Sequence, residues 1–300
     1  MTLLKILLCI ALSCALTACG TATPRSPKVS YPVVRVYVQP STTLSTLPLQ
    51  VAARLGFFAQ QHIQVEWVRH QDRATLQVGN GETPYPIDGF LTQKPDLVLV
   101  APIADPHFRW RSLTHLPIFY AKHVGPLVPY LRAVLASHQV VPEAFTALNL
   151  SQITERWRQK TLPWVVVTLK DYFQLRGAVP GSTVLAFIGA STGPVPVTMI
   201  TGTSPHALAF VSAVNLALWY LHTTSPESIA QLLRTDKPDP SLGPAVKRAL
   251  HYRYWPTTVV LTPPVYQRGQ RLLTPSGPWP SYSIRVDAKL AEAALTYRAP

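Results

Sequence analysis

Cysteine is nearly missing from this 300-residue sequence, which contains only three. All of them, Cys9, Cys14 and Cys19, lie within the first twenty positions. The rest of the chain can therefore form no disulfide, no thiolate metal site and no cysteine nucleophile. The nine histidines include no pair at the H-x-x-x-H spacing of a helical metal site. We therefore expect neither a metal nor another cofactor.

Acidic residues are also scarce in this chain. The chain has 14 Asp and Glu against 27 Lys and Arg, a net charge of +13, and only 14% of its residues are charged, compared with roughly 25% in ordinary soluble proteins. Excess positive charge is typical of proteins that bind nucleic acid or an anionic membrane. These cations are scattered and do not alternate with aromatic residues, so nucleic acid is not an expected partner. A basic surface beside anionic lipids and an acidic exterior both remain open interpretations.

Long apolar runs are also absent, except at the N-terminus. Lys5 precedes the apolar run Ile6–Leu16, which is followed by Thr17-Ala18-Cys19-Gly20. A charged start, a short apolar stretch and small residues at its end are typical of a secretory signal. The run is too short for a comfortable membrane span. We predict a signal peptide over residues 1–18 and a tether rich in Pro, Ser and Thr over residues 19–31.

The end of the signal resembles the lipobox of bacterial lipoproteins. Leucine at minus three, alanine at minus one and cysteine at plus one are all present around Cys19. The resemblance implies that Cys19 carries the lipid and anchors an extracytoplasmic protein to the outer face of the cytoplasmic membrane. An ordinary signal peptide with a chance cysteine is the alternative.

The body opens with a strand, a helix and a strand. The β-branched run Val33–Val38 predicts a buried strand, Leu47–Leu55 a helix that Gly56 ends, and the alternating Ile63–Val68 a second strand. This order predicts a βαβ unit with a parallel sheet. Asp96–Ala101 predicts a further buried strand.

The same residues resemble the opening of one group of ABC-importer solute-binding proteins, which includes binders of nitrate, taurine, aliphatic sulfonates and thiamine pyrimidine precursors. The pattern is Leu47-Pro48-x-x-x-Ala52-x-x-x-Gly56-Phe57-Phe58, followed by Gln61–Glu66. Later passages, including Trp110–Leu113 and Gly193–Met199, follow the group in order to about residue 260. The chain departs from the group before Asp96, where the usual glycine of a Gly-x-x-Asp step is Gln93.

The resemblance implies an α/β protein with the two-lobe, type 2 periplasmic-binding-protein fold and a hinge of two chain crossings. It places residues 32–112 plus 204–300 in lobe I and residues 113–203 in lobe II. The function it implies is that of a lipid-anchored binding protein, monomeric and not an enzyme. Such a protein delivers a small polar or anionic ligand to an ABC permease and its ATPase.

The candidate site follows from the predicted strands. Ligands of open α/β sheets bind outside the carboxyl ends of strands, which indicates the loops after Val38, Ala101, Ala121 and Leu169. Two of these loops lead into helices, whose N-termini favour anions. The residues that we expect to contact the ligand supply hydroxyl, carboxylate, imidazole or exposed backbone groups: Ser41, Thr42, Thr43, Thr46, Asp105, His123, Gly125 and Asp171.

Two other functions remain open. Gly189–Gly193 matches the G-x-S-x-G nucleophile elbow, which would make the protein an exported α/β serine hydrolase using Ser191. The elbow needs a helix after the serine, however, and Pro194 and Pro196 disfavour one, so a Ser/Thr/Gly turn is the simpler interpretation. The other alternative is a lipoprotein that has lost transport and acts as a sensor. The aromatic cluster Tyr252, Tyr254 and Trp255 either lines a cleft or packs the lobes together.

Overall fold

The computed structural model describes residues 30–40, 42–80, 83–234, 239–274, 276–278 and 280–299. Residues 32–300 form one compact unit. The predicted signal peptide, residues 19–29 of the predicted tether with the predicted lipidation site Cys19, and the candidate ligand residue Ser41 lie outside the described residues. No helix within the described ranges is long and apolar enough to cross a membrane.

The first sheet has the strand order β2-β1-β3-β10-β4. Strand β1 (Val33–Val38) pairs in parallel with β2 (Gln64–Val68) and β3 (Leu76–Gly79). Strand β10 (Thr198–Gly202) is antiparallel to β3 and to β4 (Ile87–Thr92). The predicted βαβ unit is therefore confirmed. We call this sheet and the helices packed on it the first lobe.

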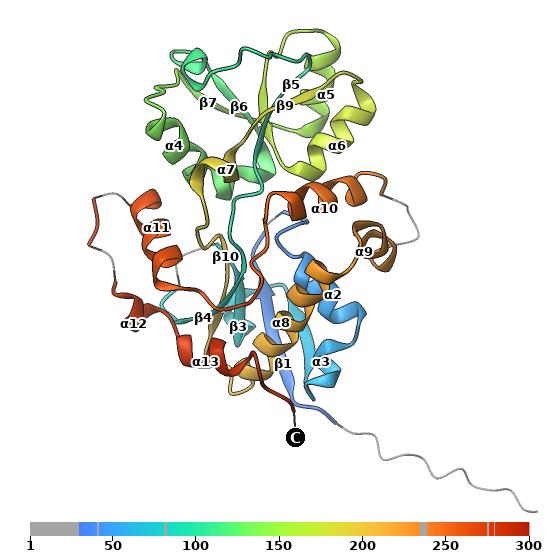
Figure 1. Cartoon of the computed structure of the whole chain (residues 1–300), viewed down its shortest axis with the longest axis vertical. Coiled ribbons are helices and arrows are strands. Elements are labelled where there is room, and N and C mark those ends of the chain that lie inside the picture. The colour runs from blue at the N-terminus through green and yellow to red at the C-terminus, as the bar shows by residue number, and fades with distance from the viewer. Residues whose placement is uncertain are drawn as a thin grey trace, which may run out of the picture. The chain divides into compact units, whose positions relative to one another are not determined.

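The second sheet has the order β7-β6-β8-β5-β9 and forms the upper part of the body in Figure 1. Strand β6 (Ile118–Ala121) is parallel to β7 (Phe145–Leu148) and β8 (Val165–Val167). Strand β5 (Val98–Ala101) is antiparallel to β8 and to β9 (Thr183–Phe187). This sheet and its helices are the second lobe.

Helices cover both sheets. In chain order they are α2 (Leu47–Arg54), α3 (Phe57–Gln60), α4 (Val128–Ser137), α5 (Leu150–Arg158), α6 (Leu169–Ala178), α7 (Ile188–Thr192), α8 (Ala207–Thr223), α9 (Pro226–Leu232), α10 (Leu242–His251), α11 (Pro263–Leu273), α12 (Tyr282–Arg285) and α13 (Ala288–Ala293). Three 3₁₀ helices are η1 (Gln71–Arg73), η2 (Trp110–Leu113) and η3 (Lys122–Leu127). The two α/β lobes confirm the predicted fold class.

Local chemistry explains several helix ends. Gly56 has φ +69°, a left-handed conformation that glycine adopts without steric cost, and it separates α2 from α3. The Ser225 side chain accepts the Ser228 amide and caps α9. Phe58 stacks on Phe210 of α8, with ring centroids 5.2 Å apart, and meets the edge of Trp67 on β2. The Gly-Phe-Phe segment thus joins helix to helix as well as helix to sheet.

Strand pairing divides the chain differently from the boundaries expected from sequence. Those boundaries put β5 in lobe I and β10 in lobe II, whereas β5 pairs in the second sheet and β10 in the first. Each strand joins its sheet antiparallel to its neighbours, directly after a crossing between lobes. We therefore propose that the crossings lie near residues 93–97 and 193–197.

A third segment packs against these crossings. The Gln93 side-chain amide donates to the carbonyls of Arg253 and Trp255, at 3.0 and 3.2 Å. The Lys94 ammonium donates to the Tyr252 carbonyl, and Tyr252 stacks on Phe187 of β9 with centroids 3.9 Å apart. The aromatic cluster therefore packs around the hinge.

Candidate functional site

Parallel strands of both sheets end at the same cleft. It is lined from the first lobe by Pro40, Thr42, Ser45, Asn80 and Thr198, and from the second lobe by His123, Pro126 and Leu127. The loops after β1 and β3 face the loop after β6, as expected for ligands of open α/β sheets. The topology thus brings segments that are distant in the chain to one place.

The lobes are in contact across this cleft. The Asn80 side-chain amide donates to the Pro126 carbonyl at 3.1 Å. The free volume between the lining residues is about 10 Å³, room for about one water molecule. The cleft continues into a wider cavity of about 540 Å³, lined by Pro40, Lys122, His123, Pro126, Asn149 and Leu150. A ligand larger than water can therefore enter the inner cleft only if the lobes separate.

His123 stands at the junction of the cleft and the cavity, where it is held by Asp171. Its Nε2 lies 2.8 Å from Asp171 Oδ2, and half of its side chain remains exposed. The same carboxylate oxygen accepts from the Thr168 hydroxyl at 2.7 Å and from the Thr168 amide at 3.1 Å. Thr168 in turn caps α6 by accepting the Asp171 amide. The capping arrangement fixes the carboxylate that orients the imidazole.

This pair also sets the charge at the cavity. The hydrogen bond to Asp171 raises the pKa of His123 above its ordinary value. Burial acts to raise the pKa of Asp171, but the hydrogen bonds from His123 and Thr168 outweigh it and the pKa is lowered. The pair therefore favours the charged imidazolium more than an unpaired histidine would. The Lys122 side chain lies on the same wall of the cavity.

Behind the cleft lies a buried group of polar side chains. Thr42 and Ser45 share a hydrogen bond of 2.8 Å, and Ser45 shares another of 2.8 Å with the Tyr254 hydroxyl. Thr92 donates to Thr198 at 2.9 Å. Asp96, on the crossing after β4, accepts the Leu169 amide of α6 at 3.0 Å. All six of these side chains are buried.

The structure brings together only some of the residues expected from sequence. Thr42 and His123 line the cleft, and Asp171 supports His123. Thr46 instead donates to the Thr43 carbonyl and lines a separate groove of about 480 Å³ beside α2 and Trp67.

Thr43 and Gly125 do not line the inner cleft. Thr43 is half-buried and is not among the residues that line the cleft or its wider cavity. Gly125 is part of η3, where an added Cβ would meet nothing within 4 Å, so no close backbone approach requires glycine there.

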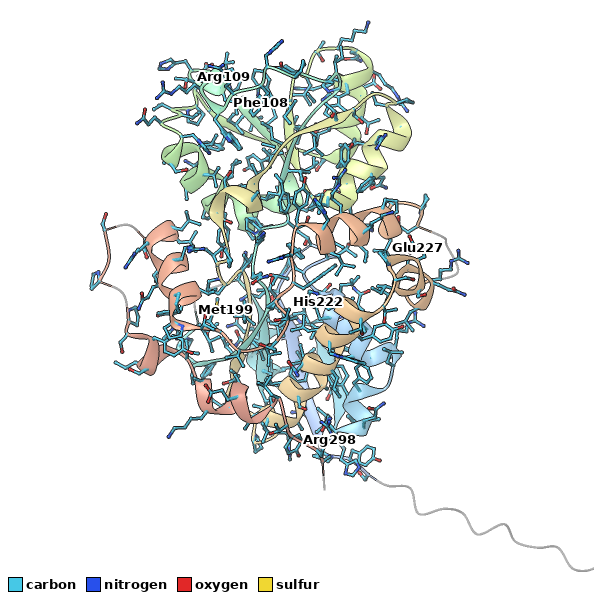
Figure 2. All side chains as sticks on the ribbon, in the orientation of Figure 1. Phe108, Arg109, Met199, His222, Glu227 and Arg298 are labelled. Atoms are coloured by element: carbon cyan, nitrogen blue, oxygen red, sulfur yellow. The ribbon has the colours of Figure 1, made fainter. Side chains whose placement is uncertain are left out.

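Asp105 lies away from the cleft. Because β5 is antiparallel to β8, its carboxyl end points to the opposite edge of the second sheet. Asp105 follows that end, is exposed, and accepts the amide of His107. The amide of Phe108 donates to the Asp105 carbonyl, and Phe108 lies at the outer end of the second lobe in Figure 2, whereas Met199, next to Thr198, lies in the first. The loop after Ala101 therefore does not contribute to the candidate site.

The residues expected from sequence did not include Ser45, Asn80, Asp96 or Thr198. Asn80 follows the short strand β3, which the apolar pattern does not distinguish from a loop. Asp96 occupies the acidic position of the Gly-x-x-Asp step noted in the resemblance, which was a signal for it. The sequence indicated the aromatic cluster that includes Tyr254, but not its partner Ser45, which is about 210 residues away.

Ser191 is not in the position of a nucleophile elbow. It is the fourth residue of α7, which directly follows β9, so the expected Ser/Thr/Gly turn is a short helix. An elbow holds its serine in the turn between strand and helix. Among the described residues, no histidine or carboxylate is hydrogen-bonded to the exposed Ser191 side chain. The helix ends at Gly193, which has φ +63° and precedes Pro194.

We expect Ser191→Ala to change ligand affinity by less than about twofold and stability by less than about 0.5 kcal/mol, because the side chain is exposed. Labelling with a fluorophosphonate probe should give no adduct on the wild-type protein. An adduct that is lost in Ser191→Ala would establish a nucleophile and contradict the assignment.

Comparisons with known proteins agree on the fold. No family model matches the chain, and neither does any curated protein sequence. The ligand-binding component of an ABC-type import system from Staphylococcus aureus, with zinc bound, superposes with a TM-score of 0.63 at 9% identity, covering 88% of this chain and 99% of that one. The periplasmic aliphatic sulphonate binding protein SsuA from Escherichia coli gives 0.63 at 14% identity, covering 87% and 92%. The desulfurization enzyme DSZB gives 0.62 at 10% identity, covering 88% and 99%.

These similarities confirm the periplasmic-binding-protein fold that the sequence resemblance implies. At such low identity they establish the fold alone. Both binding proteins and an enzyme share it, so function has to be argued from the site.

Proposed function

We propose that this protein is an extracytoplasmic binding protein that captures a small polar or anionic ligand between its lobes and delivers it to an ABC permease and ATPase. The observation that supports this most directly is the convergence of loops from both sheets on one cleft. A ligand gripped from both sides would hold the lobes closed, and a closed form is one that a permease can recognise. The lobes act within one chain, so the protein would work as a monomer.

The charge of the cavity supports an anionic or polar ligand. Lys122 and the His123 imidazolium supply positive charge, while the cleft hydroxyls and the Asn80 amide supply hydrogen bonds. Such a set matches small oxyanions and sulfonates better than apolar molecules. A sensor without transport would use the same site, and pull-down of a permease with the ligand-bound protein distinguishes the two.

A thermal-shift panel of nitrate, alkanesulfonates and thiamine precursors tests the binding function. At one hundred times its dissociation constant, a true ligand should add about 2.7 kcal/mol of stability. His123→Ala should lower affinity about tenfold or more, since it removes a charged hydrogen-bond partner. His107→Ala, an exposed histidine at the outer end of the second lobe, is the matched control and should change nothing. Equal loss in both variants, or no stabilising compound, would contradict the proposal.

Membrane attachment is tested separately. We propose that Cys19 carries a lipid, so Cys19→Ser should leave the precursor uncleaved or release the protein from membranes. Mass spectrometry of the native N-terminal peptide measures the modification directly. An unmodified N-terminus at another position would show that the leader is an ordinary signal peptide.

A further inference from the structure

The buried carboxyl group of Asp96 lies where the chain crosses between the lobes. It lies on the crossing that leads from β4 in the first sheet to β5 in the second, and its side chain is fully buried. Its Oδ1 accepts the Leu169 amide at the start of α6, which belongs to the second lobe. Tyr254, on the first-lobe side of the hinge, is near enough for the Asp96 charge to raise its pKa further, after the main effect of burial. One carboxyl group is thus hydrogen-bonded to the second lobe and lies near Tyr254 and Thr42 of the first, at the point about which the lobes would move.

The surroundings of Asp96 do not compensate a negative charge. Its Oδ2 makes no hydrogen bond of normal geometry with any described residue, although the nearby Thr42 hydroxyl has some stabilising effect. The charged groups that face it are Asp171, which opposes ionisation, and His123, which favours it, and these two are paired with each other. Lys94 of the same crossing is directed to the Tyr252 carbonyl. Burial therefore dominates and raises the pKa of Asp96 from 3.8 to about 7.

We propose that Asp96 links closure of the lobes to proton uptake, so that the closed form holds the protonated acid and the open form the hydrated carboxylate. This inference deepens the proposed function and rests on it, because it takes the two lobes to separate and close about a ligand. Thr42 lines the cleft, and its hydroxyl lies close enough to Asp96 to stabilise the ionised carboxyl. Separation of the lobes would admit water to the cleft beside Thr42 and so to Asp96. Ligand binding would then be proton-linked, and tighter in an acidic exterior.

The direction in which pH changes the closing equilibrium follows from the pKa of Asp96 in the closed and the open forms. Asp96 binds its proton more tightly in the closed form, where its pKa is about 7, than in a hydrated form at the ordinary 3.8. Closure is therefore fully favoured below about pH 4. Between about pH 4 and pH 7 the closing equilibrium constant should fall by up to about tenfold per pH unit. Above about pH 7 the carboxyl is ionised in both forms, and the constant should no longer change.

The test measures the distance between the lobes without any ligand. Fluorophores are attached by non-cysteine chemistry at two exposed residues, Gln60 at the end of α3 and Gln159 directly after α5. They report the distance by energy transfer in the full-length protein. The wild type should open progressively from pH 4 to pH 7. Asp96→Asn, which keeps an acceptor for the Leu169 amide, should stay closed throughout that range. A pH-independent distance in the wild type, or an unchanged pH response in Asp96→Asn, would overturn the inference.

Three further variants keep the test decisive. Thr42→Val removes a hydroxyl that lowers the pKa of Asp96, so the upper end of the opening range should move to higher pH even if Asp96→Asn folds poorly. Asp88→Asn is the matched control, since Asp88 is another buried carboxyl with a pKa raised to about 7, but on β4 beside Asp287 and away from the hinge. It should leave the response unchanged. If His123→Ala abolishes the response, the proton acts at His123 and the inference fails.

Different results would contradict the proposed binding function and the proton link at Asp96. A chain that opens with pH but is stabilised by no compound in the ligand panel would contradict the proposed function and leave the proton link supported. A chain that binds a compound of the panel but shows no pH-dependent distance would contradict the proton link alone.

Discussion

Replacing Trp255 by alanine is expected to lower the free energy of unfolding by about 3–5 kcal/mol. Trp255 is fully buried at the hinge, and its indole N–H donates to the Leu44 carbonyl at 3.0 Å. That carbonyl belongs to the loop after β1, which supplies Thr42 and Ser45 to the cleft. The variant therefore removes both a large part of the core and the attachment of a ligand loop.

Chemical denaturation measures the loss, and two variants separate its causes. Trp255→Phe keeps most of the volume but removes the donor, so it should cost about 1–3 kcal/mol for the unpaired buried carbonyl. Trp219→Ala, at a side chain that is 60% exposed, should cost less than about 0.5 kcal/mol. Equal effects of Trp255→Ala and Trp219→Ala would show that the hinge aromatics do not stabilise the fold.

Asp88→Asn is expected to raise the free energy of unfolding at pH 8 by up to about 4 kcal/mol, as a rise in the pKa of Asp88 from 3.8 to about 7 implies. Asp88 is almost completely buried on β4, and its Oδ2 has no hydrogen-bond partner among the described residues. Burial, and secondarily the charge of Asp287, raise its pKa to about 7. Asparagine keeps the shape of the side chain and removes the buried charge.

The expected gain in stability from Asp88→Asn depends on pH. The folded state binds the Asp88 proton more tightly than the unfolded state, whose pKa is 3.8. Stability therefore falls as pH rises from about 4 to about 7 and then levels off. The difference between Asp88→Asn and wild type should be near zero at pH 4 and greatest above pH 7. A difference that is the same at both pH values would point to packing, and not to ionisation, as the cause.

The buried carboxyls Asp88 and Asp96 bear on the surroundings of this basic, acid-poor chain. The composition alone leaves an acidic exterior and a surface beside anionic lipids equally open. We propose the acidic exterior, because both carboxyls stabilise the folded protein most below about pH 4 and progressively less as the pH rises to about 7.

Local elements of this protein could be predicted from its sequence. β-branched and alternating runs indicated β1 and β2, and Gly56 indicated the end of α2. These signals are local, since they depend on side-chain periodicity and on the backbone preferences of single residues. The βαβ unit could therefore be predicted from the residues, whereas the two-lobe α/β fold was implied by the resemblance to solute-binding proteins. The loop after β1, with Thr42, and the loop after β6, with His123, were predicted from the same local signals.

The pairing and the direction of the strands could not be predicted and are known from the three-dimensional structure. The antiparallel entry of β5 into the second sheet carries Asp105 away from the cleft, and the return of β10 to the first sheet brings Thr198 into it. The three-dimensional fold also places Tyr254 beside Ser45 and leaves Asp96 buried at the hinge. Pairing and burial depend on contacts between residues that are distant in the chain, and a buried strand has the same apolar pattern in either sheet and in either direction.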